Sequence, residues 1–368
     1  MTSPSDDGPS QPVPFGPFVL DRRLAVGGTA EVFLARPKLG TQPAMRFVVK
    51  RLLDSRRETE DFLALQHEAE LHQAVQHPNV VRVYGAGMVG DEPYLALEYV
   101  EGLDLYRFLR RVEAEQRQLP AELGVYIARR VAFALEAVHR AVDAQGRPLE
   151  IVHRDVTPSN VYLSVDGKVK LGDFGIARVA QQAHGSVPGG ALKGKFGYLA
   201  PEQIAGEPFD GRADLFALGA ILGELLIGEP VFPGSGELAV LLAIREANLE
   251  PLYRARRRLQ PALFDICVRA LAREPERRFQ SAAELAEALA PFETGGEAAQ
   301  SESLKQWVSS LSDSSRLAQK IQGQIRESVE KMRAVRIASG LPPVPTYTEP
   351  PPVSNLTGGP ASGGSGVS

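Results

Sequence analysis

Acidic and amide side chains with short, regular spacing stand out in the middle of this 368-residue sequence. Asp155 and Asn160 lie in the segment I-V-H-R-D-V-T-P-S-N-V-Y-L, and Asp173 follows in K-L-G-D-F-G. Carboxylate and amide oxygens suit hard cations such as Mg²⁺, and a carboxylate can also accept a proton from a hydroxyl group. Asp, Asn and Gly favour turns for other reasons, so any one of these motifs alone does not decide the chemistry.

Three motifs that follow one another in a fixed order indicate the chemistry more clearly than any one of them. His153-Arg154-Asp155 with Asn160, then Asp173-Phe174-Gly175, then Ala200-Pro201-Glu202 resemble the catalytic core of the eukaryotic-like (Hanks-type) bacterial protein Ser/Thr kinases. The resemblance covers about residues 18–292. It implies an α+β, bilobal protein kinase fold with a β-rich N-lobe and a helical C-lobe.

The resemblance also implies an activity and roles for these residues. It predicts transfer of the ATP γ-phosphate to protein hydroxyls, in which the protein mainly positions the reactants and neutralises charge. Asp155 would be the catalytic base. Asn160 and Asp173 would hold Mg²⁺ (or Mn²⁺). The implied partners are therefore ATP and protein substrates.

Two charged residues nearer the N-terminus fit the same pattern. The β-branched and aromatic run that ends at Lys50 predicts a buried strand, and by resemblance Lys50 holds the α and β phosphates. Apolar spacing over residues 58–75 predicts a helix. Glu68 in this helix matches the family glutamate that pairs with Lys50, whereas Glu70 is a nearby competitor and either could be a surface residue.

The resemblance assigns a nucleotide pocket to residues scattered over the first half of the chain. Residues 24–35 resemble the glycine-rich loop, although alanine replaces two of its three glycines and the stretch alone would predict an ordinary hairpin turn. Leu97 would be the gatekeeper, and Asp104 would bond the ribose or cap a helix. The complete set is Ala25, Val26, Gly27, Gly28, Val32, Val48, Lys50, Leu97, Glu98, Val100, Asp104 and Tyr162.

Several positions depart from the family pattern. Val48 and Tyr162 are larger than the usual alanine and leucine above and below the adenine. Thr157 stands where the family usually has lysine, and Lys195 stands where it usually has threonine. We therefore hypothesise that Lys195 supplies a displaced catalytic charge, with a solvent-facing lysine as the alternative. These departures also keep open a pseudokinase, a nucleotide-binding scaffold or signalling module without catalysis.

Other patterns predict the framework around these residues. Residues 80–84 and 94–99 read as strands that flank a glycine-rich turn at 85–93, and residues 123–140 read as a long helix. A very apolar helix begins near Asp214, which by resemblance braces the backbone around His153. Glu202 would pair with Arg278.

Composition limits the partners and the location. The net charge of −4 and the pI near 6.0 provide no basic surplus for nucleic acid. A single cysteine, Cys267, fits a reducing compartment and hence the cytoplasm, and its apolar surroundings predict burial. We expect neither a signal peptide nor a membrane span.

The two ends of the chain differ from its middle. Residues 1–14 and 340–368 are rich in Pro, Gly and Ser or Asp, which predicts disorder. Residues 300–339 predict an amphipathic helix, whose heptad seam runs over residues 304–335. Such a seam could mediate self-association or fold back on the preceding domain.

Overall fold

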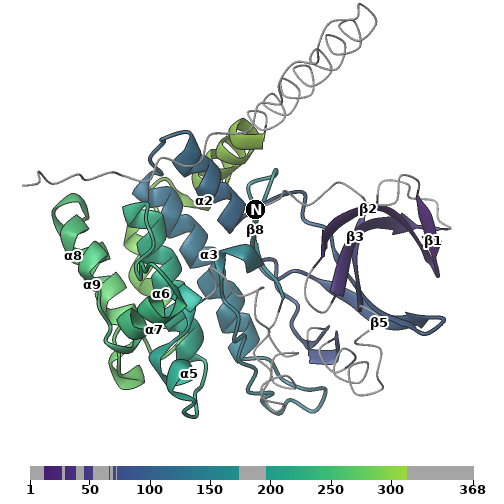
Figure 1. The fold of residues 1–368 in the computed structure, drawn as a ribbon, viewed down its shortest axis with the longest axis horizontal. Helices are drawn as coiled ribbons and strands as arrows, with labels where there is room; N and C mark the ends of the chain where they lie inside the picture. Colours follow the sequence, from purple (N-terminus) through teal and green to yellow (C-terminus); the bar gives the residue numbers. More distant parts are fainter. Residues whose placement is uncertain are drawn as a thin grey trace, which may run out of the picture. The chain divides into compact units, whose positions relative to one another are not determined.

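The computed structural model describes residues 12–26, 30–38, 45–52, 66, 69–71, 73–173 and 196–312 (Figure 1). The chain divides into two units, Met1–Ser312 and Asp313–Ser368, and all described residues belong to the first. The predictions for residues 1–11, 27, 28, 68, 195 and 313–368 therefore lie outside the described residues.

An antiparallel sheet of six strands forms the first part of the domain, in the order β1-β2-β3-β4-β6-β5. Side chains alternate between its faces: Val49 packs in a cluster with Phe15 and Phe33, whereas Val48 packs against Leu97. Each face is therefore apolar. The strands are β1 (Val13–Phe15), β2 (Phe18–Val26), β3 (Ala30–Pro37), β4 (Phe47–Leu52), β5 (Val83–Val89) and β6 (Glu92–Glu98).

Two predictions for this sheet are wrong in detail. The turn predicted at 85–93 is confined to Gly90 and Asp91, because β5 continues to Val89 and β6 begins at Glu92. Gly87 in β5 allows close packing, since an added Cβ at this position would lie 2.7 Å from the Tyr94 hydroxyl. At the N-terminus, β1 includes Val13 and Pro14 of the stretch predicted to be disordered, because Phe15 anchors it at 5% exposure.

The second part of the domain is helical and surrounds one large core (Figure 1). Every residue of α6 (Arg212–Ile227) from Ala213 to Gly223 is buried, as its apolar sequence predicts. The long helix predicted at 123–140 is α3 (Ala121–His139). The other helices are α2 (Leu105–Ala114), α5 (Pro201–Ala205), α7 (Glu237–Arg245), α8 (Glu250–Ala255), α9 (Pro261–Ala270) and α10 (Ala282–Leu289).

A small three-stranded sheet, β7-β8-β9, joins the two parts. Its strands are β7 (Gly102–Asp104), β8 (Val161–Ser164) and β9 (Val169–Leu171), and the 3₁₀ turn η2 (Pro158–Asn160) leads directly into β8. Short 3₁₀ turns also occur at η3 (Phe196–Tyr198), η4 (Arg256–Arg258), η5 (Pro275–Arg277) and η6 (Ala290–Phe292). Because β8 and β9 flank the predicted catalytic residues, this sheet positions the site.

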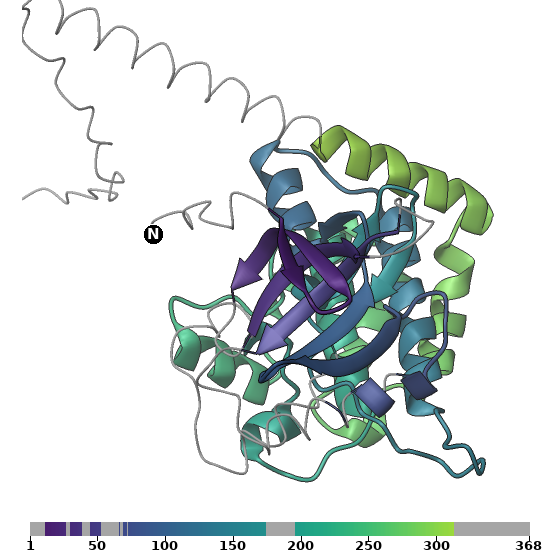
Figure 2. The ribbon, with the colours of Figure 1, turned by 90° about the vertical axis from the view of Figure 1, so that its right-hand side faces the viewer.

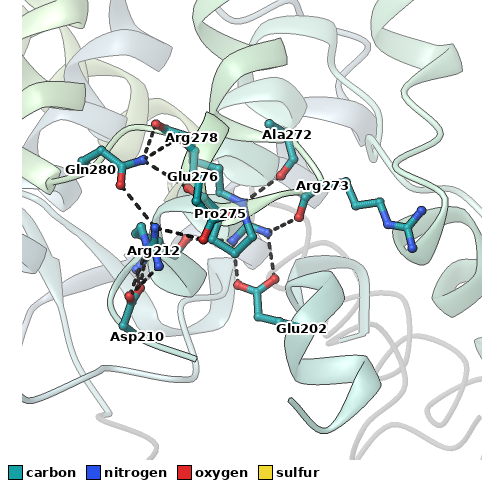
Figure 3. A network of polar contacts seen from close by, with 9 residues as sticks. All are labelled: Glu202, Asp210, Arg212, Ala272, Arg273, Pro275, Glu276, Arg278 and Gln280. Atoms are coloured by element: carbon teal, nitrogen blue, oxygen red, sulfur yellow. Dashed lines mark hydrogen bonds and ion pairs between the residues drawn. The ribbon is translucent and has the colours of Figure 1, made fainter. Parts of the chain in front are cut away.

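The predicted pair of Glu202 and Arg278 is confirmed at the base of the helical part (Figure 3). Both guanidinium terminal nitrogens of Arg278 donate to the Glu202 carboxylate at 2.7 Å. The Arg278 side chain is fully buried and also donates to the carbonyls of Ala272, Arg212 and Arg273. The pair thus ties α5 to the segment between α9 and α10.

A further helix, residues 296–312, follows η6 and packs on the large core. Leu304, Val308 and Leu311 are fully buried there. This described part of the predicted heptad seam therefore folds back on the domain, and its helix begins earlier than residue 300.

Two smaller predictions also concern the described residues. Cys267 is fully buried, as predicted, and burial raises the pKa of its thiol to about 12. No helix within the described ranges is both long and apolar enough to cross a membrane.

Candidate functional site

Asp155 and Asn160 are brought together by the tight turn before β8. The Asn160 side-chain amide donates to the Asp155 carbonyl at 2.7 Å and to the Asp155 Oδ2 at 2.9 Å. Both residues are more than nine-tenths buried. The turn therefore holds the Asp155 carboxylate in one orientation, as expected of a group that must meet a reacting hydroxyl.

Asp214 at the start of α6 braces the backbone before Asp155, as predicted. Its carboxylate accepts hydrogen bonds from the backbone N–H groups of His153 at 2.8 Å and Arg154 at 2.9 Å. His139 contacts the same carboxylate at 2.9 Å. Burial by itself would raise the pKa of Asp214, but these hydrogen bonds and the nearby histidines lower it.

The His153 ring connects this loop to the strand that leads to Asp173. Its Nε2 lies 3.2 Å from the Gly172 carbonyl, and its Nδ1 accepts from the Asp155 backbone N–H at 3.4 Å. A neutral ring with the proton on Nε2 satisfies both contacts. Complete burial lowers the pKa of His153, which agrees with this neutral form.

Lys50 and Asp173 meet across the two parts of the domain. The Lys50 ammonium lies 3.5 Å from the Asp173 Oδ1, although the residues are 123 positions apart. Asp173 takes a left-handed backbone conformation with φ of 54°, which is uncommon for a residue other than glycine. Of the two predicted glutamates, Glu70 is exposed and accepts from Gln66, whereas the prediction for Glu68 lies outside the described residues.

Four of the predicted adenine-pocket residues share one apolar cluster. Leu97 is buried in it, and Val48, Val100 and Tyr162 pack against it. Val48 lies opposite Leu97 in the ladder of β4 and β6, while Tyr162 comes from β8. The sheet and the catalytic segment thus contribute to one apolar surface, which is what a flat base requires.

The remaining described pocket residues lie on the neighbouring strands. Val32 faces Lys50 in the ladder of β3 and β4. Ala25 and Val26 are exposed at the end of β2, next to the described limit of the strand. The Glu98 Oε2 accepts from Lys170 and from the Arg82 backbone, and the Glu98 N–H donates to the Arg82 carbonyl at 2.8 Å.

Asp104 is a helix cap, which was one of its two predicted roles. Its Oδ1 accepts from the Arg107 backbone N–H at 2.7 Å, and its Oδ2 lies 3.3 Å from the Arg107 guanidinium. In the ladder of β7 and β8 it lies opposite Tyr162. The cap therefore fixes the start of α2 beside the apolar pocket.

The Tyr162 hydroxyl makes a contact that the sequence analysis missed. Burial, and next the nearby Asp173 carboxylate, raise the pKa of this phenol well above its usual value. The ring passes close to Gly172, where an added Cβ would lie 3.0 Å from the tyrosine Cε2. Only the unusual tyrosine at this position could have signalled this proximity.

Thr157 is buried at 4% exposure, and among the described residues its hydroxyl has no hydrogen-bond partner. A cavity of about 10 Å³ adjoins it and is also lined by Asp155, Tyr198 and Asp214. The predicted relation to Lys195 lies outside the described residues.

The donor set suits a hard cation. Because the Asn160 amide nitrogen donates to Asp155, its Oδ1 is the atom that can bind a metal, and Asp173 adds a carboxylate. Within the described ranges no three His, Cys, Asp or Glu side chains form a metal-binding cluster. The candidate ligands are thus one amide and one carboxylate, which leaves room for phosphate and water oxygens.

A groove of about 810 Å³ lies between α2, α6 and the loop that precedes α7. Tyr198 lines both this groove and the small cavity beside Asp155. Its hydroxyl donates to Glu224, and burial raises the pKa of both side chains. An extended partner in the groove would therefore pass close to the catalytic segment.

Comparisons with known proteins agree with this arrangement. The family model described as "Protein kinase domain" matches residues 18–289. A protein named tyrosine-protein kinase MasK, from Myxococcus xanthus, is 38% identical over 76% of this chain and 43% of its own length. The serine/threonine-protein kinase PknB of Mycobacterium leprae is 33% identical over 71% of this chain and 40% of its own length.

A solved structure shows the same fold. The crystal structure of the PknI kinase domain of Mycobacterium tuberculosis has a TM-score of 0.55 and 28% sequence identity, and the match covers 77% of this chain and 99% of that one. The chain spans less than half the length of the curated relatives named above.

Proposed function

Because this chain belongs to the protein kinase family, we propose that it is an active ATP-dependent protein serine/threonine kinase. One observation carries the proposal: the fold brings Lys50, Asp155, Asn160 and Asp173 to one site, from segments far apart in the sequence. A scaffold without catalysis has no chemical need for all four. Their joint presence therefore favours an enzyme over the pseudokinase alternative.

In the proposed reaction Asp155 accepts the proton of the protein hydroxyl while that oxygen attacks the γ-phosphorus of ATP. Asn160 keeps the carboxylate turned toward the attacking oxygen, since it holds Oδ2 at 2.9 Å. Lys50 neutralises charge on the α and β phosphates. The products are a phosphorylated protein and ADP.

The proposed cofactor set is ATP with Mg²⁺, or Mn²⁺ in its place. Bound metal would neutralise charge on the phosphates during transfer. Asn160 Oδ1 and the Asp173 carboxylate would hold it, and Glu68 would pair with Lys50. The adenine would lie between Val48 and Tyr162, with the alanine-containing loop at 25–28 over the phosphates.

The groove along α2 and α6 supports a polypeptide as the second substrate, because its volume exceeds that needed for one side chain. The named relatives include both a tyrosine-protein kinase and serine/threonine-protein kinases. We place this chain with the latter because serine/threonine-protein kinases named PknB from several mycobacteria are 33–34% identical to it. Analysis of the phosphorylated amino acid decides between the two classes.

We also propose that the protein is cytoplasmic and that its macromolecular partners are proteins and not nucleic acids. The single buried cysteine suits a reducing compartment, and the net charge of −4 supplies no phosphate-binding surplus. Self-association through residues 304–335 remains a prediction, but any dimer that uses Leu304 or Leu311 must first withdraw them from the core.

The activity test is transfer of radiolabel from ATP to a generic protein substrate, followed by phosphoamino acid analysis. Asp155→Asn should abolish transfer. Asp166→Asn makes the same chemical change on the exposed turn between β8 and β9, and it should leave transfer intact. No transfer by the wild-type chain together with tight ATP binding would identify the scaffold instead, and phosphotyrosine in the product would identify a tyrosine kinase.

A further inference from the structure

We propose that residues 293–312, which lie beyond the family match, position the nucleotide pocket through α2 and the turn between β8 and β9, with Trp307 as the principal positioning residue. The inference rests on the proposed function, because it concerns the pocket beside Asp104, Tyr162 and Asp173. Three sets of contacts hold the segment, and two of them connect directly to elements that form this pocket.

The first contact fixes the start of the segment to α3. Glu293 is 8% exposed and accepts hydrogen bonds from Arg129 at 2.8 Å and Arg130 at 2.9 Å. Arg130 also pairs with Glu297 at 2.9 Å. A buried carboxylate held by two guanidinium groups gives the segment a defined origin.

The second contact joins the segment to the turn between β8 and β9. The Ser301 hydroxyl donates to the Gly167 carbonyl at 3.1 Å, and the Tyr126 hydroxyl donates to the same oxygen at 3.1 Å. Gly167 has φ of 78°, and an added Cβ would lie 2.0 Å from the Ser301 carbonyl oxygen. The backbones therefore touch at a position that only glycine allows.

The third contact joins the segment to α2, and Figure 1 and Figure 2 show the two helices side by side. The Trp307 ring lies between Phe108, with ring centroids 6.3 Å apart, and the Arg117 guanidinium, 3.7 Å from the ring centre. Arg117 also donates to the Ser310 hydroxyl, and Arg111 donates to the Leu311 carbonyl. The segment thus contacts α2 at Phe108 and Arg111 and the turn after α2 at Arg117.

These two connections converge on one strand pair. Phe108 is fully buried one turn after Asp104, which caps α2. Gly167 follows β8, which carries Tyr162, and β9 continues to Asp173. Since Asp104 and Tyr162 are partners in the ladder of β7 and β8, the segment contacts the elements that continue from both strands.

If the segment only stabilised the fold, changes in it would alter the stability of the protein but not the nucleotide affinity of the folded molecules. Positioning makes a stronger claim, because binding energies at coupled sites are reciprocal. If displacement of Trp307 weakens nucleotide binding, then nucleotide binding must also alter the surroundings of Trp307. This second effect can be measured on the unmodified protein.

Trp307 is the only tryptophan in the chain, so its emission reports on this contact alone. The full chain is titrated with Mg²⁺ and a non-hydrolysable ATP analogue, and binding is measured in parallel by calorimetry. We expect the emission to shift with the same midpoint as the heat signal. Heat of binding without any emission change would overturn the inference and leave the proposed function intact, whereas no binding at all would overturn both.

Variants of the full chain test the reverse direction by calorimetry. Trp307→Ala and Arg117→Ala should each raise the Kd of the analogue about fivefold or more, the lower range of typical coupling, while Trp307→Phe should restore most of the affinity. Lys305→Ala changes the solvent-exposed face of the same helix and should leave the Kd unchanged. If Trp307→Ala does not fold, the Kd of the Arg117→Ala variant tests the proposal instead. Unchanged Kd values in folded variants, or an equal rise in the Lys305 variant, would overturn the proposal.

Discussion

Replacing Arg278 with alanine should destabilise the domain far more than the same change at its neighbour Arg277. Arg278 is fully buried and donates five hydrogen bonds, two of them to Glu202, which is itself 6% exposed. Removal of one partner leaves a buried carboxylate without compensation, which costs about 3–5 kcal/mol. Arg277 is 77% exposed and lies 3.8 Å from Glu274, and such pairs contribute about 0–1 kcal/mol.

The free energies of unfolding come from urea denaturation followed by far-UV circular dichroism, with unchanged slopes required for the comparison. Glu202→Ala should cost about as much as Arg278→Ala, since either change leaves a buried charge unpaired. The double change Glu202→Leu with Arg278→Met should cost less than the sum of the single changes, because no unpaired charge remains. Equal losses for Arg277→Ala and Arg278→Ala would refute the reasoning.

Three further predictions concern the site. Tyr162→Phe should lower the Mg²⁺ concentration that half-saturates nucleotide binding, because it removes a hydroxyl that lies near the Asp173 carboxylate and can compete with metal for it. An unchanged midpoint in a metal titration would contradict this. The free energy of unfolding should fall as the pH drops below about 6.5. Burial lowers the folded-state pKa of His153, so in this range the unfolded chain binds a proton that the folded chain does not. The free energies from urea curves at pH 7.5 and 5.5 should differ less for His153→Phe than for the wild-type chain. Thr157→Lys and Lys195→Thr should each reduce kcat, and the double variant should recover about 0.5–3 kcal/mol of coupling if the two residues act together; additive losses in kinase assays would rule this out.

Local pattern predicted much of the framework from the sequence. The apolar run before Gly228 gave the central helix α6, and the spacing of apolar residues gave α3. The arrangement of Asp155 and Asn160 was also predictable, because both lie in one short segment of the family pattern, and the resemblance alone gave the role of the distant Asp214.

Side-chain contacts between elements were harder to predict. Gly87 was assigned to a turn because glycine serves turns and close packing equally well, and the Tyr94 ring that needs the space lies on another strand. Asp104 kept two roles for a similar reason, since a carboxylate before a helix can cap it or face a ligand. The approach of the Tyr162 hydroxyl to Asp173 depends on a side-chain direction that no periodicity reveals.

The C-terminal segment shows the same limit at a larger scale. A heptad pattern establishes an apolar face but does not identify what covers it. Leu304 and Leu311 belong to the predicted seam, and they pack on the preceding domain. Gly167 and Arg117 complete this interface, and neither belongs to any repeat in the sequence.

The buried charges near the site make sense as positioning devices rather than as sources of stability. A buried ionic group seldom stabilises a fold more than a well-packed apolar one would, and a left-handed backbone costs about 1–3 kcal/mol at a residue other than glycine. Arg154 pays that cost, with φ of 67°, and Asp214 accepts its N–H together with that of His153. The fully buried carboxylate of Asp214 thus stabilises a strained turn. Without these two hydrogen bonds the backbone at Arg154 would relax to a less strained conformation. Because Asp155 follows directly, the strain and the buried charge together set the position of the catalytic carboxylate.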